Sequence, residues 1–90
     1  MKEDLDKRDD MSYLQTAGRA LSILKMFRQE NTLSLPAIAS GLGVGKTIAY
    51  RLVHTLMTEG FLVQDPLTKQ YSLGEQVLLL GFCAVQRQDV

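Results

Sequence analysis

The segment from Leu35 to His54 constrains the fold of this chain more than any other part of it. Two stretches in it carry apolar residues at the spacing of a helix, and a turn with several glycines separates them. Two short helices around such a turn are the signature of a helix-turn-helix. Small Ala39 suits a close crossing of the helices, and Gly43 stands where the chain must reverse, at an expected positive φ. The seam between the helices is predicted to consist of Ile38, Leu42, Val44, Ala49 and Leu52.

Start and stop signals on either side of this turn predict the extent of three helices. Apolar residues at helical spacing follow Thr16, a fair N-cap, and predict a helix that ends at about Gln29. Ser34 is predicted to cap the second helix. The third is predicted over 46–58, and Gly60 follows it, as a glycine often follows the end of a helix.

A hairpin and a last helix are predicted to follow. Residues 61–64 and 70–73 have the pattern of short strands, and residues 65–69 between them have turn chemistry. The helix predicted over 74–86 is apolar almost all round, which indicates packing against another chain or domain. The predicted fold is therefore mainly α with a small β-hairpin. It is a winged helix-turn-helix with a three-helix core, a wing and a C-terminal linker helix.

Composition limits the setting in which the chain works. Ninety residues make one domain, and a lone cysteine, Cys83, cannot form an intramolecular disulfide, which favours a reducing cytoplasmic setting. The longest apolar run, 77–85, is much shorter than the ~20 residues of a membrane span. Residues 1–10 are charged and lack the apolar core of a signal peptide. We expect no membrane partner.

The distribution of charge indicates where an anionic partner could bind. The net charge is zero, but residues 11–56 hold five cations and one anion, whereas 1–10 and 57–90 are each net acidic. A basic middle segment suits contact with phosphates. An imbalance of this size also arises by chance in a short chain, so the charge supports nucleic-acid binding weakly.

The exposed face of the third helix carries the functional prediction. Opposite its buried stripe it is expected to present a hydroxyl, a phenol, a guanidinium and an imidazole, with no carboxylate. Arg51 is the first choice for a contact with a base or a phosphate, since arginine can grip guanine bidentately. The residues of this face are Thr47, Tyr50, Arg51 and His54, and those of the stripe are Ala49, Leu52, Val53 and Leu56.

Further contacts are predicted around this face. Lys46 and Thr47 stand at the helix N-terminus, where free N–H groups and the helix dipole favour a phosphate. Ile48 lies at the edge of the face, where it is either a core residue or a contact for a thymine methyl. At the wing tip, Thr68 and Lys69 are placed to reach the sugar-phosphate backbone or a minor groove. For each of these residues the alternative is a solvated side chain without a partner.

Two other functions were weighed on the same residues. Gly45-Lys46-Thr47 ends like a phosphate-binding P-loop, but Ser40 stands where that motif needs its first glycine, and the preceding residues have helical spacing. No carboxylate pair, metal-ligand cluster or nucleophile–base set is present, so we expect no enzyme, no cofactor and no metal. A winged helix used only for protein–protein contacts stays open as the alternative.

Several linked motifs resemble the DNA-binding domain of the IclR family of bacterial transcription regulators. The resemblance covers roughly residues 14–85. It implies a winged helix-turn-helix that binds palindromic operators in double-stranded DNA as a homodimer or higher homo-oligomer, with Arg19 and the 46–51 stretch at the DNA. The motifs run from Gly18 to Leu24, Leu33 to Ala39, Gly41 to Thr47, Tyr50 to Val53, Thr55 to Leu56, Gly60 to Leu62 and Tyr71 to Gly74.

The chain departs from the family pattern at two positions. Gly45 stands where proline is common, and Ile48 stands where a hydroxyl residue is common. We expect a disordered segment over 1–12, the DNA-binding domain over 13–74 and a linker helix over 75–90. That helix is expected to lead to an effector domain absent from this chain, through which alone a small-molecule effector would act.

Overall fold

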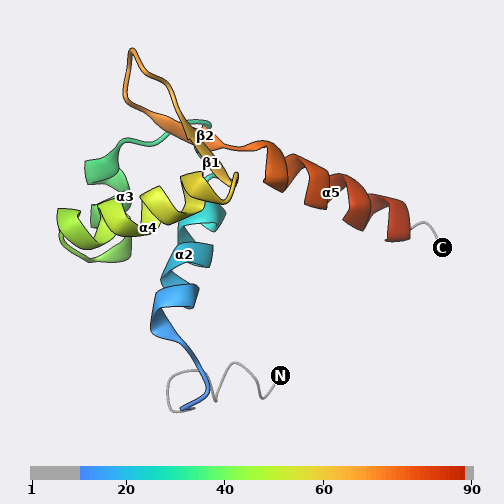
Figure 1. Cartoon of the computed structure of the whole chain (residues 1–90), viewed down its shortest axis with the longest axis horizontal. Coiled ribbons are helices and arrows are strands. Elements are labelled where there is room, and N and C mark those ends of the chain that lie inside the picture. Colours follow the sequence, from blue (N-terminus) through green and yellow to red (C-terminus); the bar gives the residue numbers. More distant parts are fainter. Residues whose placement is uncertain (1–10, 89–90) are drawn as a thin grey trace.

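The computed structural model describes residues 11–88. Most of the segment predicted to be disordered, 1–12, therefore lies outside the described residues. The elements, shown in Figure 1, are α2 (Gln15–Met26), α3 (Leu35–Leu42), α4 (Lys46–Thr58), β1 (Leu62–Gln64), β2 (Tyr71–Leu73) and α5 (Glu75–Gln88). Helices α2, α3 and α4 pack together, the hairpin lies over one end of α4, and α5 projects away from them. The prediction of a mainly helical winged helix-turn-helix is confirmed.

The turn between α3 and α4 is built as the sequence predicts. The Ser34 hydroxyl oxygen accepts a hydrogen bond from the Ala37 N–H at 3.2 Å, which caps α3. Gly43 ends α3 in the left-handed region at φ 73°, and its N–H donates to the Ala39 carbonyl at 2.9 Å. A residue with a Cβ is disfavoured in that conformation, so glycine fixes the reversal that brings α4 across α3.

Both ends of the first helix differ from the prediction. Helix α2 begins at Gln15 with Leu14 in the cap position and no side-chain cap, so Thr16 lies inside the first turn. It ends at Met26 and not at about Gln29. There the backbone changes to the i to i−3 hydrogen bonds of a 3₁₀ turn, and the Phe27 N–H donates to the Leu24 carbonyl at 3.2 Å.

The other predicted boundaries are correct to within two residues. Helix α4 has the predicted bounds, Lys46–Thr58, and Gly60 follows it at φ 85°. Each strand is one residue shorter than predicted, and α5 runs from Glu75 to Gln88 where 74–86 was expected.

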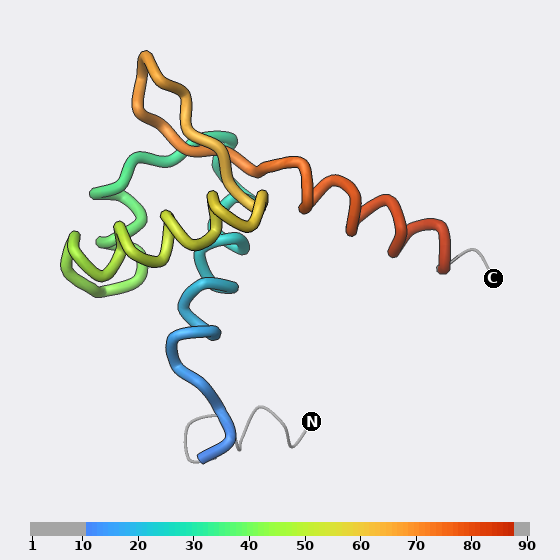
Figure 2. The backbone as a smooth tube through the Cα atoms, viewed as in Figure 1, coloured from blue at the N-terminus to red at the C-terminus, as the bar shows by residue number. Residues whose placement is uncertain are grey.

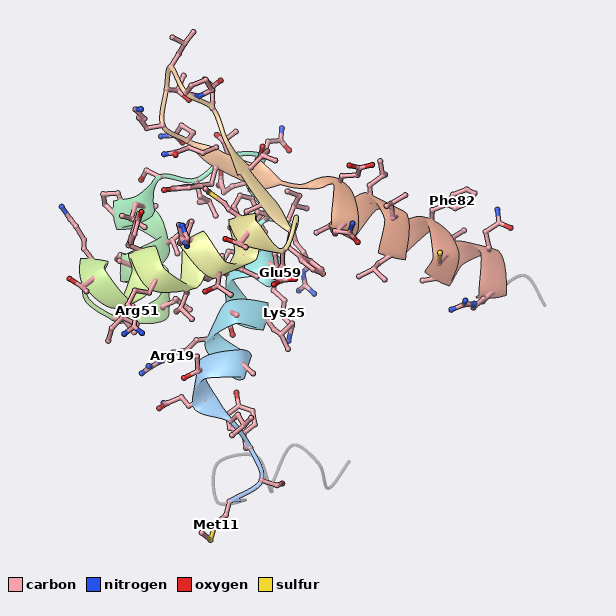
Figure 3. All side chains as sticks on the ribbon, in the orientation of Figure 1. Met11, Arg19, Lys25, Arg51, Glu59 and Phe82 are labelled. Carbon is pink, nitrogen blue, oxygen red and sulfur yellow. The ribbon has the colours of Figure 1, made fainter. Side chains whose placement is uncertain are left out.

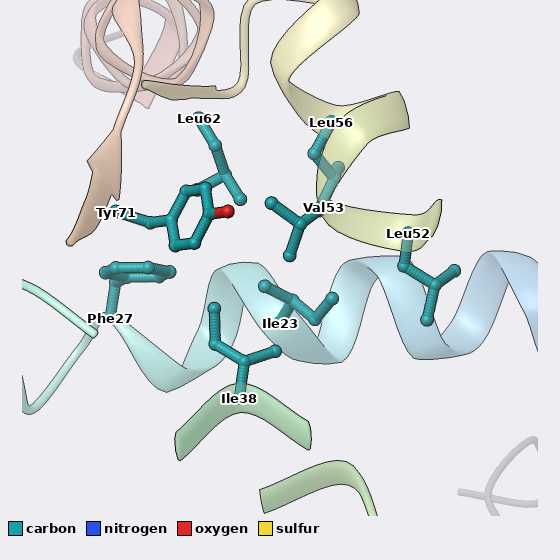
Figure 4. Packing of buried hydrophobic residues seen from close by; sticks show 8 residues of the cluster. All are labelled: Ile23, Phe27, Ile38, Leu52, Val53, Leu56, Leu62 and Tyr71. Atoms are coloured by element: carbon teal, nitrogen blue, oxygen red, sulfur yellow. The ribbon is translucent and has the colours of Figure 1, made fainter. Parts of the chain in front are cut away.

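The core forms where the three helices meet the hairpin. Ile23 of α2, Ile38 of α3 and Val53 of α4 are buried against one another and against the strands, as Figure 4 shows. Of the predicted helix–helix seam, Ile38, Ala49 and Leu52 are buried, whereas Leu42 and Val44 are half-buried. The full buried cluster is Ile23, Phe27, Ile38, Leu52, Val53, Leu56, Leu62 and Tyr71.

The wing is tied to the core through the outer edge of β2. Strands β1 and β2 are antiparallel, with Leu62 opposite Leu73. On the other edge of β2, Leu33 and Tyr71 exchange two backbone hydrogen bonds, with N–O distances of 3.0 and 2.8 Å. The chain just before α3 thus adds a one-residue third strand, which the sequence analysis did not predict. It couples the wing to the start of the helix-turn-helix.

Gly74 forms the joint between the wing and α5. Its N–H donates to the Phe61 carbonyl at 2.9 Å, and the Gln76 N–H donates to the Gly60 carbonyl at 3.0 Å. A Cβ on Gly74 would approach the Gly60 carbonyl oxygen to 2.5 Å and the Leu62 nitrogen to 3.1 Å. Only glycine allows the two segments to lie this close, so the position is fixed by packing of backbone on backbone.

Tyr71 should make the domain less stable in alkaline solution. Burial, and to a smaller degree the neighbouring Tyr50, raise the pKa of Tyr71 above its usual 10.0. The folded state therefore holds this proton more tightly than the unfolded chain. This contribution to stability is complete below about pH 10 and is lost as the pH rises further.

The measurement compares urea unfolding of the wild type and Tyr71→Phe at neutral pH and above about pH 10. The wild type should lose more of its free energy of unfolding than the variant over this range. Equal losses would show that the Tyr71 phenol is not the group responsible.

Candidate nucleic-acid interface

Helix α4 presents the predicted polar face to solvent. Its buried residues are Ala49, Leu52, Val53 and Leu56, the stripe predicted from the sequence. Lys46, Thr47, Tyr50, Arg51 and His54 are all exposed. No acidic residue lies in the first turn of the helix. The outward side of α4 is therefore polar or cationic over most of its length and carries no carboxylate before Glu59.

Ile48 belongs to the surface and not to the core. Its side chain is 42% exposed, so of the two roles left open by the sequence, a core residue or a surface residue that could contact a thymine methyl, the structure excludes the first. It lines a cleft together with Arg51 and with Arg19 of α2. An apolar side chain between two arginines can contact a thymine methyl or the edge of a sugar without competing for their hydrogen bonds.

Tyr50 and His54 form a pair of rings on α4. They stand one turn apart, with ring centroids 5.9 Å from each other and planes tilted by 35°. Packing of the two rings restricts the rotamers of both side chains. The imidazole therefore stands on the exposed face beside the phenol ring, where it can donate or accept a hydrogen bond.

The N-terminus of α4 is open. Gly45 takes the cap position at φ −75° and ψ 167° and, having no side chain, leaves the first-turn N–H groups without a side-chain cap. This φ is one that proline also adopts, so glycine in place of the family's common proline leaves the observed start of the helix unchanged. The first-turn N–H groups and the ammonium of Lys46 are available to an anion at this end of α4.

The wing tip is an ordered turn built around Asp65. Its carboxylate Oδ1 accepts hydrogen bonds from the N–H groups of Leu67 at 2.8 Å and Thr68 at 3.3 Å. The Thr68 hydroxyl oxygen accepts from the Gln70 N–H at 3.2 Å, and Lys69 takes a left-handed φ of 65°. Thr68 and Lys69 are both exposed at the end of the hairpin, apart from α4, as Figure 2 shows.

Arg19 joins the candidate surface from a different helix. Figure 3 shows its side chain and that of Arg51 reaching outward on the same side of the molecule, from α2 and α4 respectively. The cleft that they line has a volume of about 300 Å³. Its other lining residues are Thr16, Ile48, Leu52 and Thr55. Sequence reasoning missed Thr16 and Thr55; the only signal for Thr55 was its place one helical turn after Arg51.

Two features are absent from residues 11–88. In that part of the chain, no three His, Cys, Asp or Glu side chains are grouped so that they could hold a metal ion. No helix between residues 11 and 88 is both long and apolar enough to cross a membrane.

The sequence model of the IclR helix-turn-helix domain matches residues 16–66, which span α2, α3, α4 and β1. The chain belongs to the IclR family. The IclR match thus covers the helix-turn-helix, Arg19 and every candidate residue on α4, and it stops just before the wing residues Thr68 and Lys69.

Curated IclR-type relatives are transcription regulators. The glycerol operon regulatory protein of Streptomyces coelicolor is 39% identical over 69 residues, covering 76% of this chain and 27% of the relative. The regulator XynR of Escherichia coli is 31% identical over 81 residues, covering 89% of this chain and 32% of the relative. The chain therefore spans about a third or less of the length of these relatives.

Solved IclR structures share the fold. An IclR family transcriptional regulator from Brucella abortus superposes with a TM-score of 0.77 at 36% identity, over 86% of this chain and 30% of that one. HmgR of Pseudomonas aeruginosa superposes with a TM-score of 0.76 at 32% identity, over 86% of this chain and 33% of that one.

Proposed function

We propose that this chain binds double-stranded DNA and is the operator-recognition domain of an IclR-type transcription regulator, with no catalytic role. One observation carries the proposal: the exposed face of α4 is free of carboxylates and is held rigidly on a three-helix core. An α-helix fits the major groove of B-form DNA, and a face without anions avoids repulsion from the phosphates on both sides.

The residues of this face divide by their position around α4. At about 100° per residue, Thr47 stands near the middle of the outward side, with Arg51 and His54 equally far to either side of that middle and Tyr50 beyond His54. Residues in the middle approach the base edges when the helix enters the groove. A hydroxyl and an imidazole can each donate to or accept from those edges. Arg51 turns toward the cleft that it lines with Arg19. We therefore assign base contacts to Thr47 and His54, with the wing residues Thr68 and Lys69 on the backbone.

A homodimer on a palindromic operator is part of the proposal, and α5 supports it. Leu78 and Phe82 are 71% and 62% exposed, on a helix that projects from the core. An apolar groove of about 560 Å³ runs along the same side of α5. A second copy of α5 offers the same stripe, and paired apolar stripes of this kind join helices side by side. The groove is lined by Leu73, Gly74, Val77, Leu78, Gly81, Phe82 and Val85.

The same proposal covers the cellular setting. An exposed, unpaired thiol at Cys83 suits a reducing compartment, which here is the cytoplasm. We propose that residues 13–74 form the DNA-binding domain and that α5 is a linker helix. Residues 89–90 of the linker predicted over 75–90 lie outside the described residues. A small-molecule effector would act through a further domain connected by that helix.

The test is binding to duplexes selected from a random library, followed over a range of salt concentrations. Thr47→Glu places a carboxylate in the first turn of α4. The helix dipole stabilises a negative charge at this end, so the substitution should not weaken the fold. We expect it to lower affinity about ten- to hundredfold on every duplex, because the new negative charge enters the groove between the two phosphate backbones. Gln29→Glu, which adds the same charge on an exposed residue after the end of α2 and outside α4, is the matched control.

The expected wild-type result is selection of a palindromic sequence, with binding that weakens steeply as salt rises. If Thr47→Glu binds every duplex as well as the wild type does, the chain binds DNA but does not read it with α4. If the wild type recovers no duplex, the chain does not bind DNA. The alternative of a winged helix used for protein contacts alone would then account for the fold.

A further inference from the structure

The cleft between α2 and α4 brings two cationic side chains together. Two of its six lining residues are arginines, Arg19 and Arg51, and two are threonines. No carboxylate lines it, and among the described residues neither arginine has an ion-pair partner. Two guanidinium groups that face one cleft repel each other unless an anion lies between them. The cleft is therefore suited to an anionic group.

The place of Arg51 on α4 indicates which anion this is. Ile48, Arg51 and Thr55 lie on the side of α4 that lines the cleft with α2, and His54 and Tyr50 lie on the other side of Thr47. When Thr47 points at the bases, a side chain that turns from the middle of the face toward this cleft points at the wall of the groove. The wall of the major groove is the sugar-phosphate backbone, so Arg51 meets a phosphodiester before it meets a base.

Arg19 reaches the same point from a second, rigid element. It is half-buried on α2, a helix of 12 residues anchored in the core by Ile23. No acidic side chain lies in the first turn of α2, so the positive end of its dipole is uncompensated on the side where Thr16 lines the cleft. The volume of about 300 Å³ leaves room for a phosphate group and bridging water.

The neighbouring threonine has a defined place beside Arg51. The Thr55 hydroxyl donates to the Arg51 carbonyl at 2.9 Å. Its oxygen still has lone pairs for a bridging water at the edge of the cleft. The polar groups around the two arginines are thus uncharged, and the field in the cleft is set by the guanidinium groups.

We propose that Arg19 and Arg51 grip one and the same DNA backbone phosphate, so that Arg51 positions α4 on the duplex and does not read a base. The inference rests on the proposed function and deepens it. It makes the α2–α4 cleft a single site for one phosphodiester. Affinity gained there is independent of sequence, whereas discrimination between operators is left to the middle of α4.

The test is a double-mutant cycle on the duplex recovered by selection and on a mixed-sequence duplex. Arg19→Ala and Arg51→Ala should each lower affinity about tenfold or more, by the same factor on both duplexes. Because one phosphate is lost in either case, the double variant should lose less than the product of the two factors. The slope of log affinity against log salt should fall by about 0.9 in the double variant, the value for one phosphate.

A matched control uses Arg28→Ala, which removes an equal charge at an exposed residue just past the other end of α2. Combined with Arg51→Ala, its effect should simply multiply. Arg51→Lys keeps the charge but loses the planar fork, so it should recover only part of the affinity. Thermal unfolding of each variant separates a binding loss from a folding loss, and Arg19→Gln replaces Arg19→Ala if the latter melts early.

Two results overturn the inference while DNA binding stands. One is independent effects of the two arginines, with a slope loss of about 1.8 in the double variant. The other is an Arg51→Ala loss confined to the selected duplex, which would make Arg51 a base reader. Absence of duplex binding by the wild type would instead overturn the proposed function, and this inference with it.

Discussion

Ile38→Ala should lower the free energy of unfolding by about 2–5 kcal/mol, a large share of the ~5–15 kcal/mol that holds a domain together. Ile38 is fully buried and belongs to the cluster that joins α2, α3 and α4. Alanine removes three carbons from a site surrounded by three helices, which cannot all close over the gap. The helix-turn-helix should therefore be the first part of the fold to loosen.

Urea unfolding followed by circular dichroism measures this effect through the shift of the midpoint. Leu67→Ala removes an equal number of carbons at the wing tip, where the side chain is 91% exposed, and should leave the midpoint nearly unchanged. Ile38→Val should fall between the two, at about 0.5–1.5 kcal/mol. Similar midpoints for Ile38→Ala and Leu67→Ala would mean that α3 is not packed as described.

Phe82→Glu should convert the proposed homodimer into a monomer. Burying a phenylalanine contributes about 1.5–3 kcal/mol, and a twofold interface contains the substitution twice. The loss is then about 3–6 kcal/mol, or at least a hundredfold in the dissociation constant of the dimer. Binding to a palindromic duplex should weaken as well, because each recognition helix would bind its half-site alone.

Sedimentation or light scattering under reducing conditions provides the measurement, since the exposed Cys83 also lies on α5. Leu67→Glu introduces the same charge on a similarly exposed apolar residue of the wing and should leave the mass unchanged. If the Phe82→Glu protein keeps the mass of the wild-type dimer, α5 is not the dimer interface. A wild type that is monomeric at every concentration would contradict the proposed homodimer itself.

Local sequence signals predicted the elements whose structure is locally determined. Ser34 caps α3 and Gly43 reverses the chain at positive φ, both as expected, because each role depends on one residue and its immediate neighbours. Helix α4 has the predicted bounds for a similar reason. Its apolar stripe repeats regularly from Ala49 to Leu56, and Gly60 follows its end.

Contacts between distant segments were not predictable in this way. The pairing of Leu33 with Tyr71 joins residues far apart in sequence, and no periodicity marks a strand of one residue. Thr16 was expected to cap α2, but the helix begins one residue before it, and Thr16 instead lines the cleft beside Arg19. The cleft depends on how α2 crosses α4, which is a property of the packed core.

Gly74 connects the wing to α5 and thereby fixes the orientation of α5 relative to the rest of the domain. The backbone hydrogen bonds from Gly74 and Gln76 set the direction in which α5 leaves the domain. Because Gly74 has no Cβ, its backbone packs directly against that of Gly60, which restricts this direction further. In a pair of chains held together by α5, that angle determines how far apart the two α4 helices stand. In the proposed homodimer, the distance between the two half-sites of an operator would thus depend on the backbone contacts of Gly74.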